Sequence, residues 1–311
     1  MHGWRASIVL LILLVATVTG MVWLLRPAVF GAGGGQPRLD AAAIPEPHDQ
    51  NTPDGTSPES SRERRQTEVD NSEAAAEPEG PRLYLVLDDA GHDLDHLREF
   101  VPFPGVFTVA VLPGLTYSRE AAQMVIALGH EAILHQPMEA VGGNDPGPGA
   151  IVVSQSEREI RRILTSNLST MPGVVGVNNH MGSLATGDAR VMQEVAATLR
   201  RHRLFFLDSR TTHLSVAGET IRTAGVPTVE RDVFLDNVRE DEAISDQLDR
   251  GLAIAEEQGH AILIGHVTSP ELAQVLIDRY AEISEAGYTF SPLSDLINRE
   301  REPLNDANSG N

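Results

Sequence analysis

Short apolar runs recur along the chain from residue 83 onward and predict the strands of a buried sheet. They lie at residues 83–87, 106–112, 131–134, 173–177, 204–207, 227–230 and 261–265, and residues 288–293 are a candidate for one more. Nearly every position in these runs is apolar, instead of every second one. A sheet built from them is therefore expected to be covered on both faces.

Between the runs, apolar residues recur at the spacing of one helix face. Three sets show it: Ile160, Ile163, Leu164 and Leu168; Ile244, Leu248 and Leu252; and Leu272, Val275, Leu276 and Ile283. Such alternation of strand and helix predicts parallel strands joined by crossover helices. Seven or eight units favour an α/β fold with a closed or nearly closed barrel. A doubly wound open sheet is the alternative.

The first 80 residues lack this alternation. Residues 6–25 form a charge-free apolar run between Arg5 and Arg26, which is long enough to cross a bilayer as a helix. The short segment before it predicts that the N-terminus stays inside and the rest is exported, with a cleaved signal peptide as the alternative. Residues 31–80 are rich in Gly, Pro, Ser and Glu, a composition that buries too little apolar surface to fold.

The pattern predicts four parts. They are a transmembrane anchor at residues 1–30, a disordered linker at 31–80, one folded domain at 81–298 and a disordered tail at 299–311. The expected location is the inner, cytoplasmic membrane, crossed once. The folded domain is then expected in the periplasm or otherwise outside the cytoplasm.

Composition narrows the chemistry available to the folded domain. The 311-residue chain contains no cysteine and no lysine, so thiolate metal sites, cysteine nucleophiles and lysine Schiff bases are excluded. Any catalytic group must come from His, Asp, Glu, Ser, Thr or Tyr. The formal net charge of −20 argues against nucleic acid as a partner, because phosphates require a basic surface.

Acidic, amide and imidazole side chains follow directly after five of the predicted strands. They are Asp88 and Asp89; His135; Asn178, Asn179 and His180; Asp208, Ser209 and Arg210; and His266. The carboxyl ends of parallel strands meet at one rim, where functional groups collect. Several Asp and His residues at one rim predict a cation site. Imidazole with carboxylate suits Zn, Fe, Co or Mn better than Mg or Ca.

Taken singly, the same residues also have structural interpretations. Asp88 and Asp89 fit helix capping or an Asx turn, and a histidine at a strand end fits simple packing. Asp208 fits an ion pair with Arg210, and Asp232 fits the shaping of a loop. Only their concentration at one rim favours a shared site.

Six short motifs occur in order along the domain. They are LVLDDAG at 85–91, GHEAILHQPME at 129–139, GVNNHMGS at 176–183, LDSRTT at 207–212, DVFLDN at 232–237 and AILIGH at 261–266. Together they resemble the NodB-type polysaccharide deacetylases and, more specifically, their divergent branch. Each motif alone is weak, and the resemblance depends on their shared order.

The resemblance covers residues 82–297 and implies a distorted (β/α)7 barrel. It also implies metal-dependent removal of acetyl groups from N-acetylated sugars, with zinc as the expected metal. By position, Asp88 corresponds to the general base, Asp89 and His135 to metal ligands, and His266 to the general acid.

The chain departs from the family pattern at two places. Glu139 stands where the second motif normally ends in histidine, and the usual Arg-Pro-Gly motif is replaced by NNHMG. The third metal ligand is therefore open between His180, which restores a His-His-Asp set, and Glu139. The other role open to Glu139 is to support His135 as a hydrogen-bond partner, and Asn179 is a further candidate for such support.

Two functions remain open. The first is hydrolysis of N-acetyl groups on a cell-envelope polysaccharide or peptidoglycan-like glycan. In it, Asp208 or Asp232 orients His266, and loop N–H groups near Gly182 support the oxyanion. The alternative is a catalytically degenerate barrel that binds a glycan or a cell-wall remodelling partner, which the altered motifs favour. Phosphoester hydrolysis is disfavoured, since the rim lacks a cluster of arginines.

Overall fold

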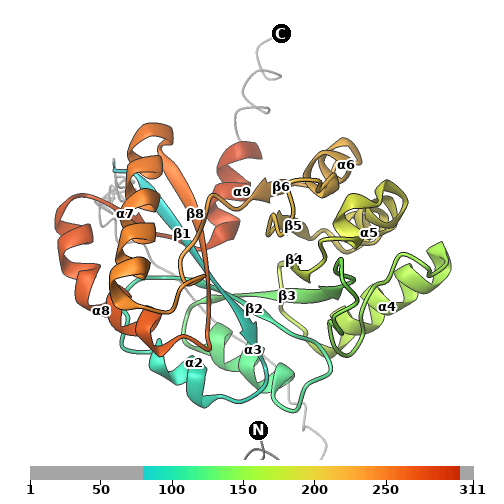
Figure 1. The fold of residues 1–311 in the computed structure, drawn as a ribbon, viewed down its shortest axis with the longest axis horizontal. Coiled ribbons are helices and arrows are strands. Elements are labelled where there is room, and N and C mark those ends of the chain that lie inside the picture. The colour runs from blue at the N-terminus through green and yellow to red at the C-terminus, as the bar shows by residue number, and fades with distance from the viewer. Residues whose placement is uncertain (1–79, 302–311) are drawn as a thin grey trace, which may run out of the picture. The chain divides into compact units, whose positions relative to one another are not determined.

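The computed structural model describes residues 80–301, which form an alternating α/β fold (Figure 1). The predicted membrane anchor and nearly all of the predicted linker lie outside this range. Within residues 80–301, no helix has the length and apolar character needed to cross a membrane.

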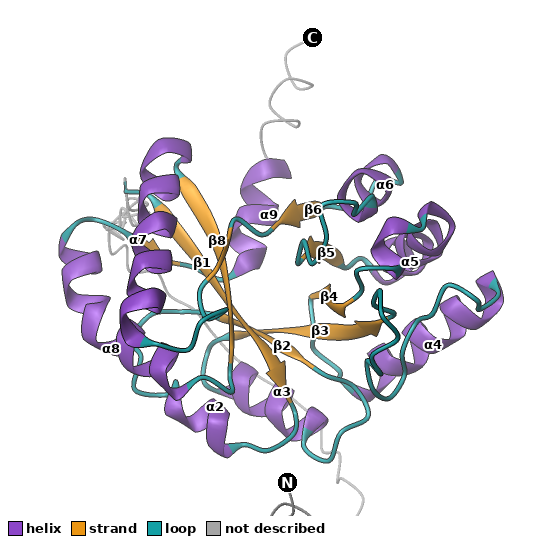
Figure 2. Ribbon diagram, in the orientation of Figure 1, coloured by secondary structure: helices purple, strands orange, loops and turns teal. Residues whose placement is uncertain are grey.

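Nine strands make up the sheet of this range, and Figure 2 separates them from the helices. The strands are β1 (Arg82–Ala90), β2 (Thr108–Val111), β3 (Glu131–Met138), β4 (Gly176–Met181), β5 (Phe205–Asp208), β6 (Thr228–Glu230), β7 (Val233–Phe234), β8 (His260–His266) and β9 (Thr289–Phe290). The helices are α2 (Asp95–Glu99), α3 (Ser118–Ala127), α4 (Glu157–Thr170), the 3-10 helix η1 (Ala185–Gly187), α5 (Ala189–His202), α6 (Ala217–Thr223), α7 (Asp241–Gln258), α8 (Pro270–Glu285) and α9 (Leu293–Arg301).

The strands are all parallel, as the alternation predicted, but the barrel does not close through hydrogen bonds. The order is β6-β5-β4-β3-β2-β1-β8-β7, with β9 paired to the start of β1. Among the described strands, none joins β6 to β7. The chain itself crosses between these two edges, where Arg231 N donates to the Asp208 carbonyl and Asp232 N donates to the Ile262 carbonyl. The sheet is therefore a curled partial barrel. The short strand β9 lies within the candidate run at residues 288–293, whereas the short strand β7 was not among the predicted runs.

The polar strand ends belong to the sheet and not to loops. The third apolar run was predicted to end at 134, yet β3 continues to Met138, and β4 continues to Met181. The two strands pair in register through this polar part, with His135 opposite Asn178 and Pro137 opposite His180. The backbone hydrogen bonds between β3 and β4 fix the side chains at these positions more rigidly than a loop would.

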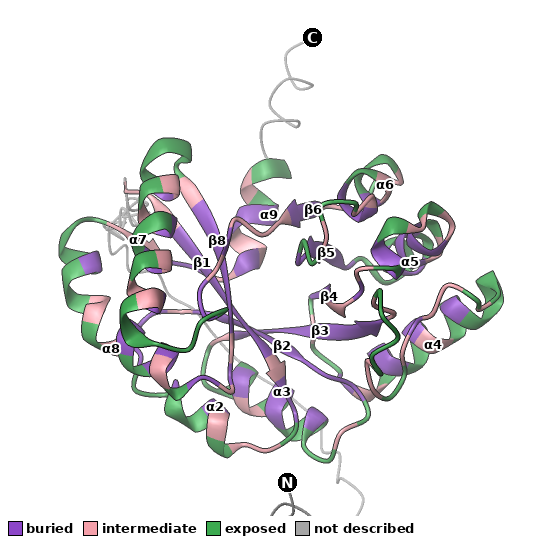
Figure 3. Cartoon of the chain, in the orientation of Figure 1, coloured by how far each residue is buried: buried purple, intermediate pink, exposed green. Residues whose placement is uncertain are grey.

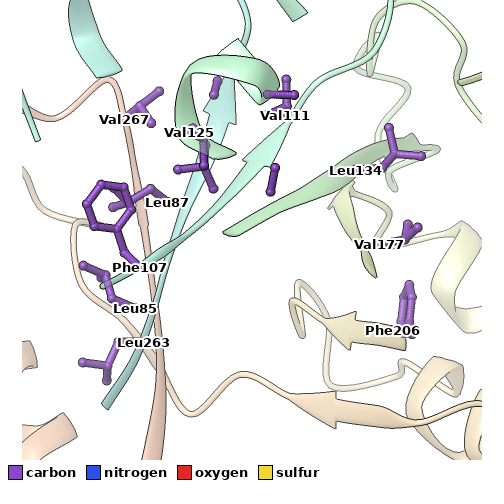
Figure 4. Packing of buried hydrophobic residues seen from close by; sticks show 14 of the residues in the cluster. Leu85, Leu87, Phe107, Val111, Val125, Leu134, Val177, Phe206, Leu263 and Val267 are labelled. Atoms are coloured by element: carbon purple, nitrogen blue, oxygen red, sulfur yellow. The ribbon is translucent and has the colours of Figure 1, made fainter. Parts of the chain in front are cut away.

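Alternation of side chains divides the core into two clusters. The larger lies between the sheet and helices α2 to α8, and Figure 4 shows part of it, including Leu85, Leu87 and Leu134. The smaller lies on the inner face of the curled sheet, where Tyr84, Val86 and other alternate strand residues meet α9. Figure 3 shows the strands almost wholly buried between these layers, as the continuous apolar runs predicted.

Helix α9 fills the inner space at the amino ends of the strands. Its Leu293, Leu296 and Ile297 belong to the inner cluster. Its first turn is held by the buried Glu131 carboxylate, which accepts from the backbone N–H of Ser294 and from the Thr108 hydroxyl. The helix continues to Arg301, beyond the predicted domain end at residue 298. At the carboxyl ends of the strands no such helix covers the inner face within residues 80–301, and polar side chains follow the apolar ones there.

Replacement of Leu85 by alanine tests the outer cluster. Leu85 is fully buried in β1, so the Leu85→Ala substitution is expected to lower the free energy of unfolding by about 2–5 kcal/mol. The control is Leu128→Ala, because Leu128 is 49% exposed and the change there should stay within about 0.5 kcal/mol. Urea unfolding followed by circular dichroism measures both, and equal effects would contradict the packing described here.

Candidate metal and catalytic centre

The period of two along each strand brings five polar residues to the inner face of the sheet. Val86 and Ile133 point into the inner cluster, so residues two further along, Asp88 and His135, lie above it on the same face. The same parity places Asn178 and His180 on β4 and His266 on β8 there. Asp88 pairs in register with His266, and His135 pairs with Asn178.

A bulge in β1 lets two consecutive carboxylates reach one imidazole. The register between β1 and β2 shifts between Leu87 and Ala90, and Asp89 has a left-handed φ of 67°. In a regular strand, Asp88 and Asp89 would point to opposite faces. Here Asp88 Oδ2 lies 3.6 Å and Asp89 Oδ1 lies 3.2 Å from His135 Nε2. A strained conformation of this kind in a non-glycine residue is typical of functional sites.

Three ligand-type atoms face one another in a nearly equilateral triangle. Asp89 Oδ1 lies 3.2 Å from His135 Nε2 and 3.0 Å from His180 Nδ1, and the two nitrogens are 3.1 Å apart. Atoms bound at zinc distances in a tetrahedron are roughly 3.3 Å apart, which this triangle approaches. Asp89 Oδ1 is buried and has no hydrogen-bond partner of acceptable geometry in the described range. An orphaned carboxylate oxygen between two imidazoles fits a cation.

The three residues brought together are those of the His-His-Asp set considered above. Of the two candidates for the third ligand, His180 joins Asp89 and His135 in this group of closely spaced ligand atoms. Glu139 takes another role, since its carboxylate accepts a 2.7 Å hydrogen bond from the backbone N–H of Val153. This hydrogen bond fixes the path of the loop between β3 and α4.

Asn178 connects the two halves of the centre. Its side-chain oxygen lies 2.7 Å from His135 Nδ1, and its amide nitrogen donates to Asp88 Oδ1 at 2.9 Å and to Ser209 Oγ at 3.2 Å. Because the amide oxygen accepts from Nδ1–H, the tautomer inferred for His135 leaves the Nε2 lone pair facing Asp89. Asn179 was the predicted hydrogen-bond partner in this part of the chain, but Asn178 contacts His135. Asn178 is one residue earlier and therefore lies on the inner face of β4, which is the pattern in the sequence that distinguishes the two.

Asn179 shapes the chain after β4. Its side chain accepts from the backbone N–H of Ser209 and donates to the Met181 carbonyl. Met181 and Gly182 both have positive φ, at 54° and 92°. These hydrogen bonds hold the turn that follows His180, so Asn179 positions the turn and does not contact the three ligand-type atoms through an observed hydrogen bond.

Asp236 is the carboxylate that orients His266. Its Oδ1 lies 2.8 Å from His266 Nδ1, and its Oδ2 accepts from the His266 backbone N–H. Burial alone would lower the pKa of His266, but the contact with Asp236 and the charges of Asp88 and Asp89 outweigh it and raise the pKa to about 9. The ring also stacks near Phe234, with centroids 6.0 Å apart.

The expectation that Asp208 or Asp232 orients His266 is therefore corrected. Asp208 lies on the outer face of β5, because Phe205 and Leu207 belong to the inner cluster. Its carboxylate accepts from the Ser215 hydroxyl and from the Arg210 backbone N–H. Asp232 accepts from the backbone N–H of Ile262, four residues before His266 on β8. The ion pair considered for Asp208 is also absent, because the Arg210 guanidinium pairs with Glu230.

The environment shifts the pKa values of the neighbouring Asp88 and Asp89 in opposite directions. Burial raises the pKa of Asp88, and this exceeds the opposing effect of the His135 and His266 imidazoles. Burial acts in the same direction on Asp89, but contact with His135 and His180 holds the pKa of that carboxyl well below its usual range. Neighbouring titratable groups whose pKa values are shifted in opposite directions are typical of active sites, where the two groups have different roles.

A cavity of about 200 Å³ opens beside the triangle. Its wall includes Asp89 and His180, the loop residues His92 and Asp145, and four prolines, Pro113, Pro137, Pro146 and Pro148. Gln136 and Asn167, both buried, hold the Gly149 carbonyl and fix the base of the loop that bears Asp145. The arrangement thus combines three residues that could hold a metal ion, a carboxyl and an imidazole group on adjacent strands, and an adjoining cavity.

Asp236 is expected to determine the titration of His266. The Asp236→Asn substitution should lower the pKa of His266 from about 9 toward the ordinary value of ~6.5, as measured by NMR titration with exposed His202 as an internal reference. Since folding raises this pKa, its stabilising contribution is complete below pH ~6.5 and is lost as the pH rises through about 9. An unchanged titration in Asp236→Asn would contradict the pairing.

Comparison with known proteins agrees with this geometry. A family model described as divergent polysaccharide deacetylase matches residues 85–297. An uncharacterized protein, YibQ, from Escherichia coli is 35% identical over 185 residues, which are 60% of this chain and 58% of the relative. A Haemophilus influenzae protein is 32% identical over 185 residues, 60% of this chain and 66% of that one. The matched part is thus less than two thirds of either relative.

A solved structure shows the same fold. It is the crystal structure of the uncharacterized protein ATU2773 from Agrobacterium tumefaciens, with a TM-score of 0.67 at 22% identity, covering 70% of this chain and 89% of that one. At this identity the likeness concerns the fold alone. The family match includes all five inner-face residues of the centre, from Asp88 to His266. The chain belongs to the divergent polysaccharide deacetylase family.

Proposed function

We propose that the protein is a metal-dependent deacetylase that hydrolyses the N-acetyl amides of a cell-envelope polysaccharide. The observation that supports it most directly is the triangle of Asp89, His135 and His180 on the same inner face as Asp88 and His266. A general base and a general acid near a ligand triangle are the groups that hydrolysis of an unreactive amide requires.

Asp89, His135 and His180 would hold the metal, and their donor set favours zinc or a similar transition ion. When bound, such an ion polarises the amide carbonyl and lowers the pKa of a water molecule. Three protein ligands are the number that catalytic zinc sites use, in contrast to the four of structural sites. Asn178 keeps the His135 ring in the orientation and tautomer that a ligand needs.

Asp88 takes the proton of the attacking water in this proposal. Its side chain is buried and receives one hydrogen bond from Asn178 on Oδ1. The other oxygen, Oδ2, points toward His135 Nε2 and hence toward the triangle. A carboxylate deprived of bulk water accepts a proton more readily than an exposed one.

His266 donates the proton that the departing amine needs. With a pKa near 9, its imidazole is protonated at neutral pH, and Asp236 holds Nδ1 so that Nε2 is the donating atom. Asp88 and His266 lie opposite each other on paired strands β1 and β8. Proton removal and proton delivery therefore come from neighbouring positions of one rigid sheet.

The substrate class is inferred from the family and from the predicted organisation of the chain. A cavity of about 200 Å³ beside Asp89 and His180 offers polar groups at His92 and Asp145 and apolar surface at its prolines. Such a mixture suits a sugar ring, which has both polar edges and apolar faces. The predicted membrane anchor and exported domain favour an N-acetylated glycan of the cell envelope as the substrate and the inner membrane as the location.

A second candidate is binding of a glycan without catalysis. The observation in its favour is Glu139 in place of the usual histidine, with its carboxylate committed to Val153. Against it, His180 supplies an imidazole to the same triangle, and Asp236 maintains a protonated His266 that a binding protein does not need.

Metal binding is expected to depend on the triangle and not on Glu139. The purified chain should bind about one zinc ion, and the Asp89→Asn and His180→Ala variants should each lose it, by elemental analysis after dialysis. Glu139→Gln should keep the metal. Asn178→Ala should weaken zinc binding about 10–100-fold, because His135 loses its orienting partner. Zinc retained by His180→Ala and lost by Glu139→Gln would reverse the ligand assignment.

Catalysis is expected to depend on Asp88 independently of the metal. Asp88→Asn should reduce acetate release from N-acetylglucosamine oligomers by about 10²–10⁴-fold while the zinc content is unchanged. Full activity in that variant would exclude Asp88 as the base. A wild-type chain that binds zinc and the oligomers but releases no acetate would favour the non-catalytic alternative.

A further inference from the structure

A larger cavity lies at the other end of the sheet. Its volume is about 440 Å³, and it is bounded by the amino ends of β4, β5 and β6 and by helix α9. Three arginines line it, Arg200 and Arg203 at the end of α5 and Arg301 at the end of α9, and no acidic residue does. A cavity whose charged lining residues are all cationic is unexpected in a chain of net charge −20.

These three guanidinium groups form no ion pair within residues 80–301. Some other arginines of this range have carboxylate partners, as in the pairs of Arg161 with Glu194 and Arg210 with Glu230. Mutual repulsion of like charges opposes such a cluster unless solvent or an anion offsets it. Arginine is the residue that best matches phosphate and carboxylate through paired N–H donors.

The backbone at Arg203 is a second, separate observation. Each of the helices α3 to α8 is followed by a residue of positive φ before the next strand. Five of these residues are glycines, Gly129, Gly173, Gly225, Gly259 and Gly287, and the sixth is Arg203, with φ 58°. Glycine adopts this conformation without strain, whereas arginine does not. The chain therefore keeps an arginine where the other turns have the residue that suits the backbone.

Helix capping accounts for only part of this cluster. Cations in the last turn of a helix interact favourably with its dipole, which applies to Arg200 and Arg201 in α5 and to Arg301 in α9. It does not explain why Arg203 replaces glycine, or why the ends of two different helices bring arginines to one cavity. Arg201 lies in the same turn but does not line the cavity, which makes it a natural control.

The floor of the cavity is apolar. Leu204, Phe205 and Val226 line it, together with Val175, whose side chain is left 40% exposed. Ser294 and Asn298 of α9 add neutral hydrogen-bonding groups. The cavity thus offers a charged rim for an anionic group and apolar surface for the body that bears it, within the volume usual for organic ligands.

We infer that this cavity binds a phosphate ester, with the phosphate on Arg200, Arg203 and Arg301 and the organic body against Phe205 and its apolar neighbours. The site is distinct from the candidate catalytic centre, because it is formed by the opposite ends of the strands. It does not depend on the deacetylase proposal.

Phenyl phosphate is the probe, since it combines a phosphate with an apolar ring. Isothermal titration calorimetry on the full chain, with chelator present to remove any metal, should show saturable binding of phenyl phosphate and none of phenol. Arg203→Gly should weaken that binding about tenfold or more, because charge-assisted hydrogen bonds are lost. The same variant should raise the urea midpoint, since glycine fits the left-handed turn.

Arg301→Gln should weaken binding to a similar degree, and Arg201→Ala should leave it unchanged. Competition with glycerol 3-phosphate or with short-chain phosphatidylglycerol, against phosphatidylcholine of the same length, then distinguishes a soluble ester from a lipid headgroup. Failure of the wild-type chain to bind phenyl phosphate at millimolar concentration overturns the inference. Equal binding by Arg203→Gly and Arg301→Gln overturns it as well, even if both variants are fully folded.

Discussion

The structure depends on the constraint that side chains of a strand alternate between two faces. On β1, β3 and β8 the inner-face positions are apolar in the middle of the strand and polar at both ends: Arg82, Glu131 and His260 stand at the amino ends, and Asp88, His135 and His266 near the carboxyl ends. The apolar middle packs against α9, and the polar residues near the carboxyl ends form the candidate centre directly above it. One sheet therefore supplies both the core that keeps the strands in register and the polar side chains of the candidate centre, whose positions depend on that register.

Asn178 joins the two parts of the candidate centre through hydrogen bonds. Its two hydrogen bonds to His135 and Asp88 connect a candidate metal ligand to the candidate base, and it is fully buried. A neutral amide suits the position because it donates to a carboxylate and accepts from an imidazole at the same time. The deacetylase pattern that the chain resembles has an arginine motif in this part of the sequence. The present chain has residues of strand β4 in place of that motif.

Much of the fold could be predicted from the sequence, because continuous apolar runs and helical spacing are local signals. The rim residues Asp88, Asp89, His135, His180 and His266 could be found too, since each follows an apolar run. The partner of His266 could not, because Asp232 and Asp236 lie just before and just after the two-residue strand β7, and the sequence does not show which of them comes level with His266. That alignment is determined by pairing with β8, which is a tertiary property.

The sequence also could not predict whether the barrel closes or what Glu139 contacts. The strands at the open edges are only two or three residues long, and whether they pair depends on the path of Arg231 and Asp232 between them. The carboxylate of Glu139 was a candidate ligand by its position. Its direction is set by the return of the chain at Val153, fourteen residues later.

The place of α9 has a consequence for how the chain acquires its structure. The central strand β1 is among the first parts of the domain to be synthesised, yet its neighbours β8 and β9 and the helix that fills the inner space come last. Contacts between segments so far apart form slowly, and the inner core is incomplete until residue 297 has emerged. The inner face of the sheet therefore reaches its final packing only after the C-terminal helix has been synthesised.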